Sequence, residues 1–437
     1  MALIRPFEGL YYNTNQVKLN DVISPPYDVL SSAQQQELYE RSPYNIIRLI
    51  LNRDQEGDNE TTNRYTRAAA FLSNARESKT ILQDSDSALY EYRQRFPHPF
   101  HPDQLVERSS LLAALKLEPY QTGIVLPHEE THPKAKQDRL FLMRAARANP
   151  EPIYGLYEDT QAIVEKMLSA SRSANVPLLH ASSPCSYSPK NEEHLIYRIA
   201  DASLLASLSD FFSDKRVWIA DGHHRYETAL NYKQEYGGPS YPLQPRDYIL
   251  IALTSFEDPG LVVLPTHRLV KNITISRMEE LPLLLERYFH LQTVSIEDAR
   301  NWIKQRKEGS KRFVILLADR AFNLTLRGDE LPKDAVQEEH CDAWRRLDVS
   351  ILQTLVLDRS LGISWQDLAH TPDVAYTREE EEAVQKVIRG EYQLACLLQN
   401  PTVTEVRDVA SAGDKMPQKS TFFYPKLYSG LLIRTLE

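Results

Sequence analysis

The sequence predicts a mixed α/β (α+β) protein. Apolar residues recur at helical spacing in some segments, and they alternate or run continuously, as in strands, in others. Of the 437 residues, 42% are hydrophobic and 25% are charged, a composition typical of a globular chain with a buried core. We expect a catalytic α/β core with helical insertions over 1–265, an α/β subdomain over 266–335, and a helical and strand segment over 336–437 that returns to the core.

The elements of the first part follow from periodicity and turn residues. A proline-rich turn at 24–28 precedes Ser31 or Ser32, either of which can cap a helix that ends near Arg41. Helical spacing marks 60–79 and 134–148, and it predicts one long amphipathic helix over 192–212. Strands are expected at 46–51, 88–93 and 217–220, a helical or mixed segment at 104–116, and a helix at 223–236 that Gly237 and Gly238 end.

The remaining chain continues the alternation of helices and strands. The apolar runs 248–256 and 261–264 are joined by a turn at 257–260, a pattern that predicts a hairpin. Further helices are expected at 278–288, 296–307, 343–357 and 378–389, a strand pair at 312–326 and a strand at 392–398.

Charge, cysteine content and hydropathy exclude several classes of protein. Lys and Arg number 51 against 60 Asp and Glu, for a net charge of −9, so we expect no nucleic-acid partner. The cysteines, Cys185, Cys341 and Cys396, form no metal-binding motif. No apolar run is long enough for a membrane span, so we expect no membrane partner and a cytoplasmic location. The Gly-rich loops of the common nucleotide-binding motifs are also missing.

The sharpest candidate site is the segment from Asp221 to Arg225. An apolar strand, a turn at Gly222 and a helix N-terminus that carries His223, His224 and Arg225 predict an anion-binding pocket. Arg225 can hold a phosphate with two hydrogen bonds, and either histidine can transfer a proton near neutral pH. Asp221 could orient a histidine, accept a proton or hold Mg²⁺. The alternative is a turn followed by a helix that the histidines cap.

A second constellation combines His128 and Glu129 with Lys136, Asp138 and Arg139. A zincin helix is excluded because Pro133 breaks any helix at this point. The loop and the following helix could face a polyanion, or they could form a solvated charged surface. Two further candidates are Lys419, Ser420 and Lys426, which could contact phosphate, and Tyr27 and Asp28 on the rigid turn. Core packing and a structural turn are the respective alternatives.

Taken together, these motifs resemble a bacterial and archaeal family of unknown function, number one thousand and fifteen. The strand-Gly-His-His-Arg-helix element is also similar to a phosphate-binding element of the ParB/sulfiredoxin superfamily, which includes free-serine kinases. That resemblance implies a ParB/sulfiredoxin-like nucleotide-binding core. The motifs that carry the family resemblance are Arg5-Pro6-Phe7, Pro25-Pro26-Tyr27-Asp28-Val29, His128-Glu129-x-Thr131, Asp138-Arg139, Asp221 to Ala229 and Lys419-Ser420-Thr421-x-Phe423-Tyr424-Pro425-Lys426.

The resulting hypothesis is a phosphoryl-transfer enzyme that acts on a small hydroxyl metabolite, with serine or O-phosphoserine favoured and a nucleotide or pyrophosphate as co-substrate. Kinase and phosphatase directions stay open, and a homodimer is possible. Mg²⁺ would be held by Asp221 or Glu129. One alternative is a protein that senses a nucleotide or phosphometabolite without turnover. Another is a metal-dependent hydrolase that uses Asp221, Glu129 and the histidines 128, 223 and 224.

Overall fold

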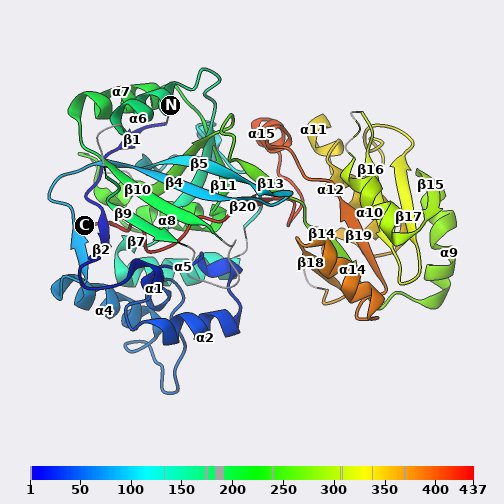
Figure 1. Ribbon diagram of the computed structural model, residues 1–437, viewed down its shortest axis with the longest axis horizontal. Coiled ribbons are helices and arrows are strands. Elements are labelled where there is room, and N and C mark those ends of the chain that lie inside the picture. The colour runs from blue at the N-terminus through cyan, green and yellow to red at the C-terminus, as the bar shows by residue number, and fades with distance from the viewer. Residues whose placement is uncertain are drawn as a thin grey trace. The chain divides into compact units, whose positions relative to one another are not determined.

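The computed structural model describes residues 2–131, 133–172, 176–182, 191–238, 241–305, 307, 309–336, 338–368 and 371–437. The chain folds into two compact units, each with its own mixed or antiparallel sheet and helices (Figure 1). The first unit comprises 1–127, 131–262 and 425–437, and the second comprises 128–130 and 263–424. The predicted mixed α/β class is confirmed. The domain boundaries that we expect from the sequence, near residues 265 and 335, stay predictions.

The first unit is built on a nine-stranded mixed sheet with the order β6-β11-β8-β12-β5-β4-β10-β9, in which β1 also pairs with β5. Its longest pairing joins β4 and β5 as an antiparallel hairpin (Figure 1), and β12 is antiparallel to β5 but parallel to β8. The strands are β1 (Ile4–Arg5), β4 (Leu89–His98), β5 (His101–Lys116), β6 (Val125–Leu126), β8 (Ile153–Tyr157), β9 (Leu179–Ser182), β10 (Glu193–Ile199), β11 (Val217–Asp221) and β12 (Tyr248–Ser255).

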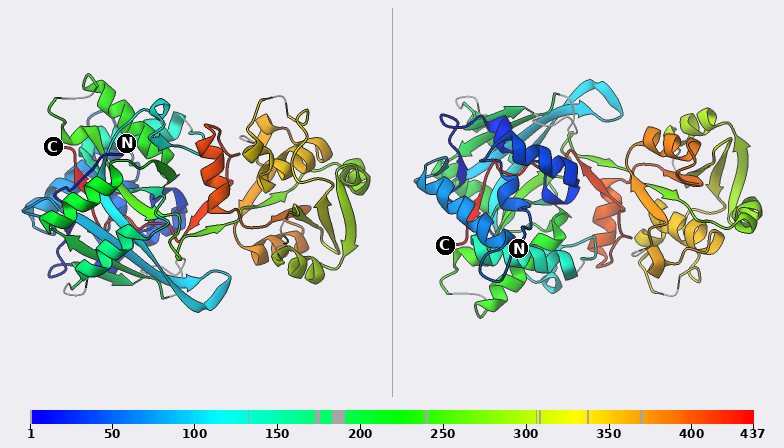
Figure 2. Two further views of the ribbon diagram at one scale, coloured as in Figure 1. Left: turned by 90° about the horizontal axis from the view of Figure 1, so that it is seen from above. Right: turned by 90° about the horizontal axis from the view of Figure 1, so that it is seen from below.

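Two short antiparallel pairs complete the strands of this unit, β2 (Leu10–Tyr12) with β3 (Ile81–Gln83) and β7 (Ala148–Asn149) with β21 (Arg434–Thr435). The second pair brings the end of the chain into the first unit, where the letter C marks it in Figures 1 and 2. The helices are α1 (Leu19–Val22), η1 (Tyr27–Val29), α2 (Ser32–Arg41), α3 (Ile47–Ile50), α4 (Arg64–Glu77), η2 (Tyr120–Thr122), α5 (Pro133–Ala146), α6 (Ile163–Arg172), α7 (Ala202–Phe212), α8 (His223–Glu235) and η3 (Pro245–Asp247).

The main core of the first unit lies between the sheet and α6, α7 and α8. Leu168 of α6, Phe212 of α7 and Tyr226 of α8 pack with Ile219 and Ile251 of the central strands, and all five side chains are buried. Burial of side chains of this size stabilises the fold by roughly 1.5–3 kcal/mol each. This core therefore fixes α8, and with it the turn at Gly222, against the sheet.

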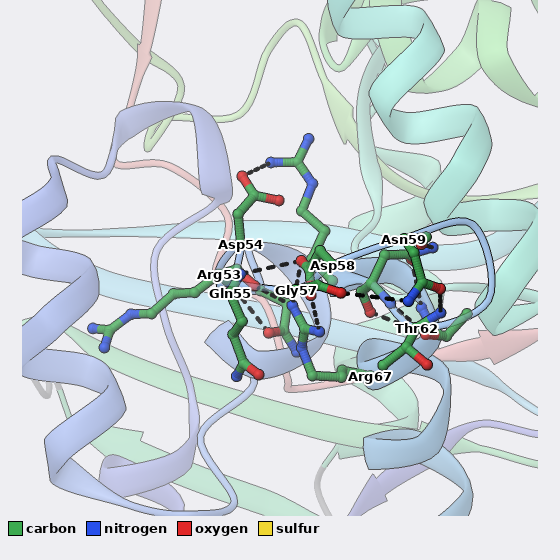
Figure 3. A network of polar contacts seen from close by, with 12 residues as sticks. Arg53, Asp54, Gln55, Gly57, Asp58, Asn59, Thr62 and Arg67 are labelled. Carbon is green, nitrogen blue, oxygen red and sulfur yellow. Dashed lines mark hydrogen bonds and ion pairs between the residues drawn. The ribbon is translucent and has the colours of Figure 1, made fainter.

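A hydrogen-bonded loop between α3 and α4 sets the start of α4 (Figure 3). Arg67 donates to both carboxylate oxygens of Asp58 at 2.6 and 2.8 Å and to the carbonyl oxygen of Arg53 at 2.7 Å. The hydrogen bond from Arg67 lowers the pKa of Asp58 to about 2. Asn63 then caps α4 by accepting from the N–H groups of Tyr65 and Thr66.

The second unit contains a six-stranded sheet with the order β15-β17-β16-β19-β14-β18, antiparallel throughout. Helices α10 and α14 bury Ile303 and Val387 against one face of it. The strands are β14 (His267–Val270), β15 (Phe289–Val294), β16 (Arg312–Leu316), β17 (Ala321–Leu326), β18 (Val374–Thr377) and β19 (Leu394–Leu398), and β13 (Val262–Leu264) pairs with β20 (Phe422–Tyr424). The helices are α9 (Ile275–Glu286), α10 (Ile296–Lys304), α11 (Asp342–Arg345), α12 (Asp348–Ile351), the π-helix η4 (Leu352–Ser360), α13 (Trp365–Leu368), α14 (Glu380–Ile388) and α15 (Val403–Ser411).

Four predicted elements were wrong. Residues 46–51 form helix α3 instead of a strand, and 104–116 form most of strand β5. The single helix expected over 192–212 is the strand β10 followed by α7, which starts where Asp201 accepts a hydrogen bond from the N–H of Leu204. The hairpin expected over 248–264 does not form, because β12 pairs with β5 and β8, whereas β13 pairs with β20.

Candidate functional site

The turn between β11 and α8 places the predicted anion-binding residues at one end of the sheet. Gly222 has a φ of +90°, a conformation that favours glycine, and it is the N-cap of α8. A bulge in the pairing of β11 with β8 lies between Ile219 and Asp221, and such bulges re-aim side chains. The sequence therefore folds here as predicted, with Asp221, His223, His224 and Arg225 around one sharp turn.

Asp221 forms a bridge between two cationic side chains. Its Oδ1 lies 2.7 Å from Nζ of Lys426, and its Oδ2 accepts a hydrogen bond from Nη2 of Arg225 at 3.1 Å. Only 19%, 12% and 11% of the Asp221, Lys426 and Arg225 side chains are exposed. Burial alone would raise the pKa of Asp221, but the charges of Lys426 and Arg225 lower it to about 2. Asp221 is thus a permanently charged counter-ion and a weak base.

Arg225 is held from several sides. Its Nη1 donates to the carbonyl oxygen of Pro152 at 2.6 Å. Burial disfavours its charge, but the carboxylates of Glu151, Asp221 and Asp28 outweigh this effect and raise its pKa. The guanidinium is therefore charged at every accessible pH and presents a fixed fork of donors.

Tyr27, Asp28 and Arg139 lie around Arg225, as the sequence predicts for a shared site. The guanidinium carbon of Arg139 lies 3.9 Å from the centre of the Tyr27 ring, and burial raises the pKa of Tyr27. Arg139 also donates to the carbonyl oxygen of Ile50 at 2.8 Å and pairs with Asp138. Tyr65 and Arg64 of α4 both donate to Asp138, so the start of α4 helps to position Arg139.

Lys136 lies next to this group but is already paired. Its Nζ contacts Oε2 of Glu227 on α8 at 2.8 Å, and Thr131 donates to the same oxygen at 2.6 Å. Glu227 is two residues beyond Arg225 along α8. Lys136 therefore ties the loop at Thr131 and helix α5 to α8, and a phosphate would have to compete with Glu227 for it.

His128, Glu129, Lys419 and Ser420 belong to the second unit. His128 is buried, and its Nε2 lies 3.1 Å from Oγ1 of Thr421 and 3.8 Å from Oε1 of Glu129. Ser420 is also buried and donates its hydroxyl to Pro417, while Lys419 has a φ of +57°. The structure brings these four residues into one neighbourhood of that unit, and their participation in the site stays a prediction.

The donor set does not fit a resident metal ion. Among the residues that the structure describes, no three His, Cys, Asp or Glu side chains gather at metal-ligand spacing. His223 is buried and His224 is half-buried, and both oxygens of Asp221 already contact cationic groups. A divalent ion on Asp221 would have to displace Lys426 or Arg225, so we derive no step through a protein-bound metal.

Two residues of the site were missed in the sequence. Glu151 accepts hydrogen bonds from the Ser429 hydroxyl at 2.7 Å and from the Tyr27 N–H at 3.4 Å. Arg108 is fully buried on β5 and donates to Gln94 and, at 2.6 Å, to the carbonyl oxygen of Pro425, the residue before Lys426. No sequence signal pointed to Arg108, which stands between Glu107 and Ser109 in the polar half of β5.

Gln94 completes the support of Lys426. Its amide nitrogen donates to the Lys426 carbonyl oxygen at 3.0 Å and to Oε1 of Glu192 at 3.3 Å. The backbone on both sides of the Pro425–Lys426 peptide bond is thus held by buried side chains. These contacts fix the backbone at Lys426 and therefore the direction in which its side chain extends toward Asp221.

Comparison with family models and curated proteins gives one match. The model of the family of proteins of unknown function DUF1015 matches residues 4–350. The search of curated proteins returned no match. No helix among the described residues has both the length and the apolar character needed to cross a membrane.

Several solved structures are distantly similar. A conserved hypothetical protein from Pyrococcus furiosus is 13% identical, with a TM-score of 0.35, over 73% of this chain and 92% of that one. A free serine kinase in complex with AMP is 12% identical, with a TM-score of 0.35, over 72% and 86%. SbnI from Staphylococcus aureus, with a C-terminal truncation, is 10% identical, with a TM-score of 0.33, over 73% and 85%.

Proposed function

The chain belongs to the family of proteins of unknown function DUF1015, and from its own residues we propose that it is a phosphoryl-transfer enzyme acting on a small hydroxyl metabolite. Serine or O-phosphoserine is the favoured substrate, and a nucleotide or pyrophosphate is the phosphoryl partner. The element from Val217 to Arg225 would serve as the phosphate-binding element of a ParB/sulfiredoxin-like core. The turnover assay below distinguishes the kinase direction from the phosphatase direction.

One observation carries the proposal: two largely buried cations, Arg225 and Lys426, share a single carboxylate beside the N-terminus of a 13-residue helix. Phosphoryl transfer depends mainly on positioning and charge neutralisation, for which fixed cations are suited. A phosphate that accepts further hydrogen bonds from these two cations would gain charge-assisted contacts, while Asp221 keeps both side chains in place. The helix N-terminus adds a favourable field for an anion.

The remaining residues would have supporting roles. His223 and His224, on the first turn of α8, are the candidates for proton transfer to or from the substrate hydroxyl. Asp221 is a poor base because its pKa is about 2, so its proposed role is to orient Arg225 and Lys426. Mg²⁺, where required, would enter with the phosphates of the nucleotide.

The first test is ligand binding to the full chain. We expect AMP, ADP, ATP, pyrophosphate or O-phosphoserine to raise the melting temperature, since a ligand that binds the native state stabilises it. Arg225→Lys and Lys426→Gln should lose this shift while retaining the circular dichroism spectrum. Arg144→Lys is the matched control, because Arg144 pairs with Glu235 at the exposed far end of α8. An unchanged shift in both site variants would overturn the proposal.

The second test is turnover. Serine with ATP, ADP or pyrophosphate should give O-phosphoserine, or O-phosphoserine should release phosphate, and His223→Gln or His224→Gln should slow the reaction at retained ligand binding. A second candidate function is a sensor that binds a phosphometabolite without turnover. The low basicity of Asp221 favours it, and ligand binding without product from any of these substrates would identify it.

A further inference from the structure

The first unit has a hollow that shares no lining residue with the cluster around Asp221 and Arg225. It has a volume of about 420 Å³ and lies where the ends of β8 and β12 meet the β5 hairpin and α6. Its size is within the range of small-molecule sites, which is roughly 300–1,000 Å³. Much of its wall is aliphatic, from Leu105, Val106, Leu111, Val164, Leu168 and Leu253.

Three carboxylates at one side of this hollow form no ion pair with any cation among the described residues. Asp159 accepts from the N–H groups of Ile163 and Val164, both at 2.9 Å. Glu257 accepts from the Asp159 N–H at 3.0 Å and from the hydroxyl of Ser255. Asp258 accepts from the N–H groups of Ser109 at 3.0 Å and Gly260 at 2.8 Å. These contacts orient the carboxylates, and among the described residues Arg108 is the cation whose charge acts on one of them, Asp258.

Other carboxylates of the same hollow are neutralised. Glu107 pairs with Arg93 and Arg95, and Glu165 pairs with Arg172. The excess of negative charge is therefore concentrated at Asp159, Glu257 and Asp258. An anion would be repelled by this side of the hollow.

Tyr157 provides an independent indication of a ligand. Only 4% of the residue is exposed, and it lines the hollow, with its ring against Phe212 at 4.7 Å between centres. Within the part of the chain that the structure describes, its hydroxyl makes no hydrogen bond. Buried tyrosine hydroxyls usually find a partner, so this hydroxyl is available to a ligand that lies against Tyr157 in the hollow.

We propose that this hollow binds an organic cation that carries an aliphatic chain, with a primary ammonium group at Asp159, Glu257, Asp258 and the Tyr157 hydroxyl and the chain along the aliphatic wall. An ammonium group offers three donors, which suits separate carboxylates and a phenol oxygen. The proposal is independent of the phosphoryl-transfer function.

The probe is hexylammonium, titrated into the full chain by calorimetry and by thermal shift. Hexan-1-ol and hexanoate have the same chain without the positive charge. We expect hexylammonium to bind and to raise the melting temperature, with at least ten-fold weaker binding of the other two. Equal effects of all three compounds, or no hexylammonium binding at millimolar concentration, would overturn the proposal.

Variants then assign the cation to these residues. Glu257→Gln combined with Asp258→Asn removes two charges but keeps an acceptor oxygen for the backbone N–H groups, and we expect hexylammonium affinity to fall at least ten-fold. Tyr157→Phe removes only the hydroxyl and should weaken hexylammonium binding several-fold. If the double variant does not fold, this single variant tests whether the cation binds at these residues. Glu56→Gln, on an exposed loop, is the matched control. Unchanged affinity in folded Tyr157→Phe and the double variant would contradict the assignment.

Discussion

Replacing Asp221 by alanine leaves Arg225 and Lys426 close together without the carboxylate that both contact. Removing one partner of a largely buried charge pair costs about 3–5 kcal/mol, because the remaining charge is neither solvated nor neutralised. We expect a loss of this order in the free energy of unfolding, measured by urea denaturation. Glu235→Ala, which breaks the more exposed pair with Arg144, should cost less than about 1 kcal/mol. Equal losses would show that Asp221 is not the buried counter-ion described here.

Glu192 and His194 are a buried pair that is neutral at pH 7. Oε1 of Glu192 lies 3.8 Å from Nε2 of His194, a distance that suggests an ion pair. However, burial raises the pKa of Glu192 from 4.5 to about 8 and lowers that of His194 from 6.5 to about 3. Each group therefore carries no charge near neutral pH, and the contact is not ionic.

This pair makes stability depend on pH in a defined window. Between pH 6.5 and 8 the folded Glu192 holds a proton that the unfolded chain has released, so stability falls as pH rises. His194 has the opposite effect between pH 3 and 6.5 and does not contribute above that range. We expect the free energy of unfolding to fall by at most about 1.4 kcal/mol per pH unit from pH 6.5 to 8 through Glu192.

The check is Glu192→Gln, which keeps the size and the acceptor for Gln94. Urea denaturation at pH 6.5 and pH 8 should give a smaller difference for the variant than for the unchanged chain. Stability that declines equally in both chains would assign the pH dependence to another group.

At the scale of residues, the sequence named several members of this cluster as candidates but could not predict their contacts. Asp221, Arg225, Tyr27, Asp28 and Lys426 were predicted, and the structure places them in one cluster. Asp221 and Lys426, however, are 205 residues apart, and no local pattern could show that they touch. For the same reason Glu151 was missed, since it gains its role from distant residues, Tyr27, Ser429 and Arg225.

At the scale of elements, the turn at Gly222 can be tested against a matched glycine. A Cβ on Gly222 would lie 2.9 Å from Ile153 and 3.0 Å from the Arg225 guanidinium, at a φ of +90°. Gly57 has a φ of +88° with no atom near its missing Cβ, in the loop of Figure 3. Gly57→Ala should cost about 1–2 kcal/mol of backbone strain alone.

Gly222→Ala should cost more than Gly57→Ala by roughly 1–3 kcal/mol, because Ile153 and Arg225 must also move. Thermal or urea unfolding of the two variants measures the difference, and the phosphate-ligand shift should fall only in Gly222→Ala. Equal unfolding free energies would show that the turn has room for a side chain.

The wrongly predicted elements share a physical cause. Leu195, Ile196 and Ile199 of β10 are all buried, and a strand buried on both faces loses the alternation that would distinguish it from a helix. Helix α3 is only four residues long, too short to show helical periodicity. The elements with an exposed polar face, such as α5 and α8, were predicted correctly because the two faces differ.

At the scale of the whole molecule, the segment from Pro425 to Glu437 completes the first unit. Leu431, Leu432 and Ile433 are buried, and Arg434 donates to Asn149 at 3.2 Å and to Tyr248 at 3.1 Å. Burial of three such aliphatic side chains contributes on the order of 5 kcal/mol, which is comparable to the entire stability of many domains. Deletion of 425–437 should therefore abolish the cooperative melting of the first unit, followed by near-ultraviolet circular dichroism.

The control for this deletion is a chain that lacks Glu437 alone. Its side chain is exposed and pairs with the equally exposed Arg147, so the melting temperature should stay unchanged. Native-like melting of the larger deletion would show that the first unit folds without its final segment.

The position of Lys426 also has a consequence for biosynthesis. A ribosome makes the turn at Gly222 some 200 residues before it reaches Lys426, so through much of translation Asp221 has Arg225 beside it but not Lys426. Any product terminated early, or clipped before residue 425, lacks the second cation and the strand that Arg434 anchors. The charge cluster is thus assembled only in chains that have been translated beyond Lys426, and shorter chains cannot form it.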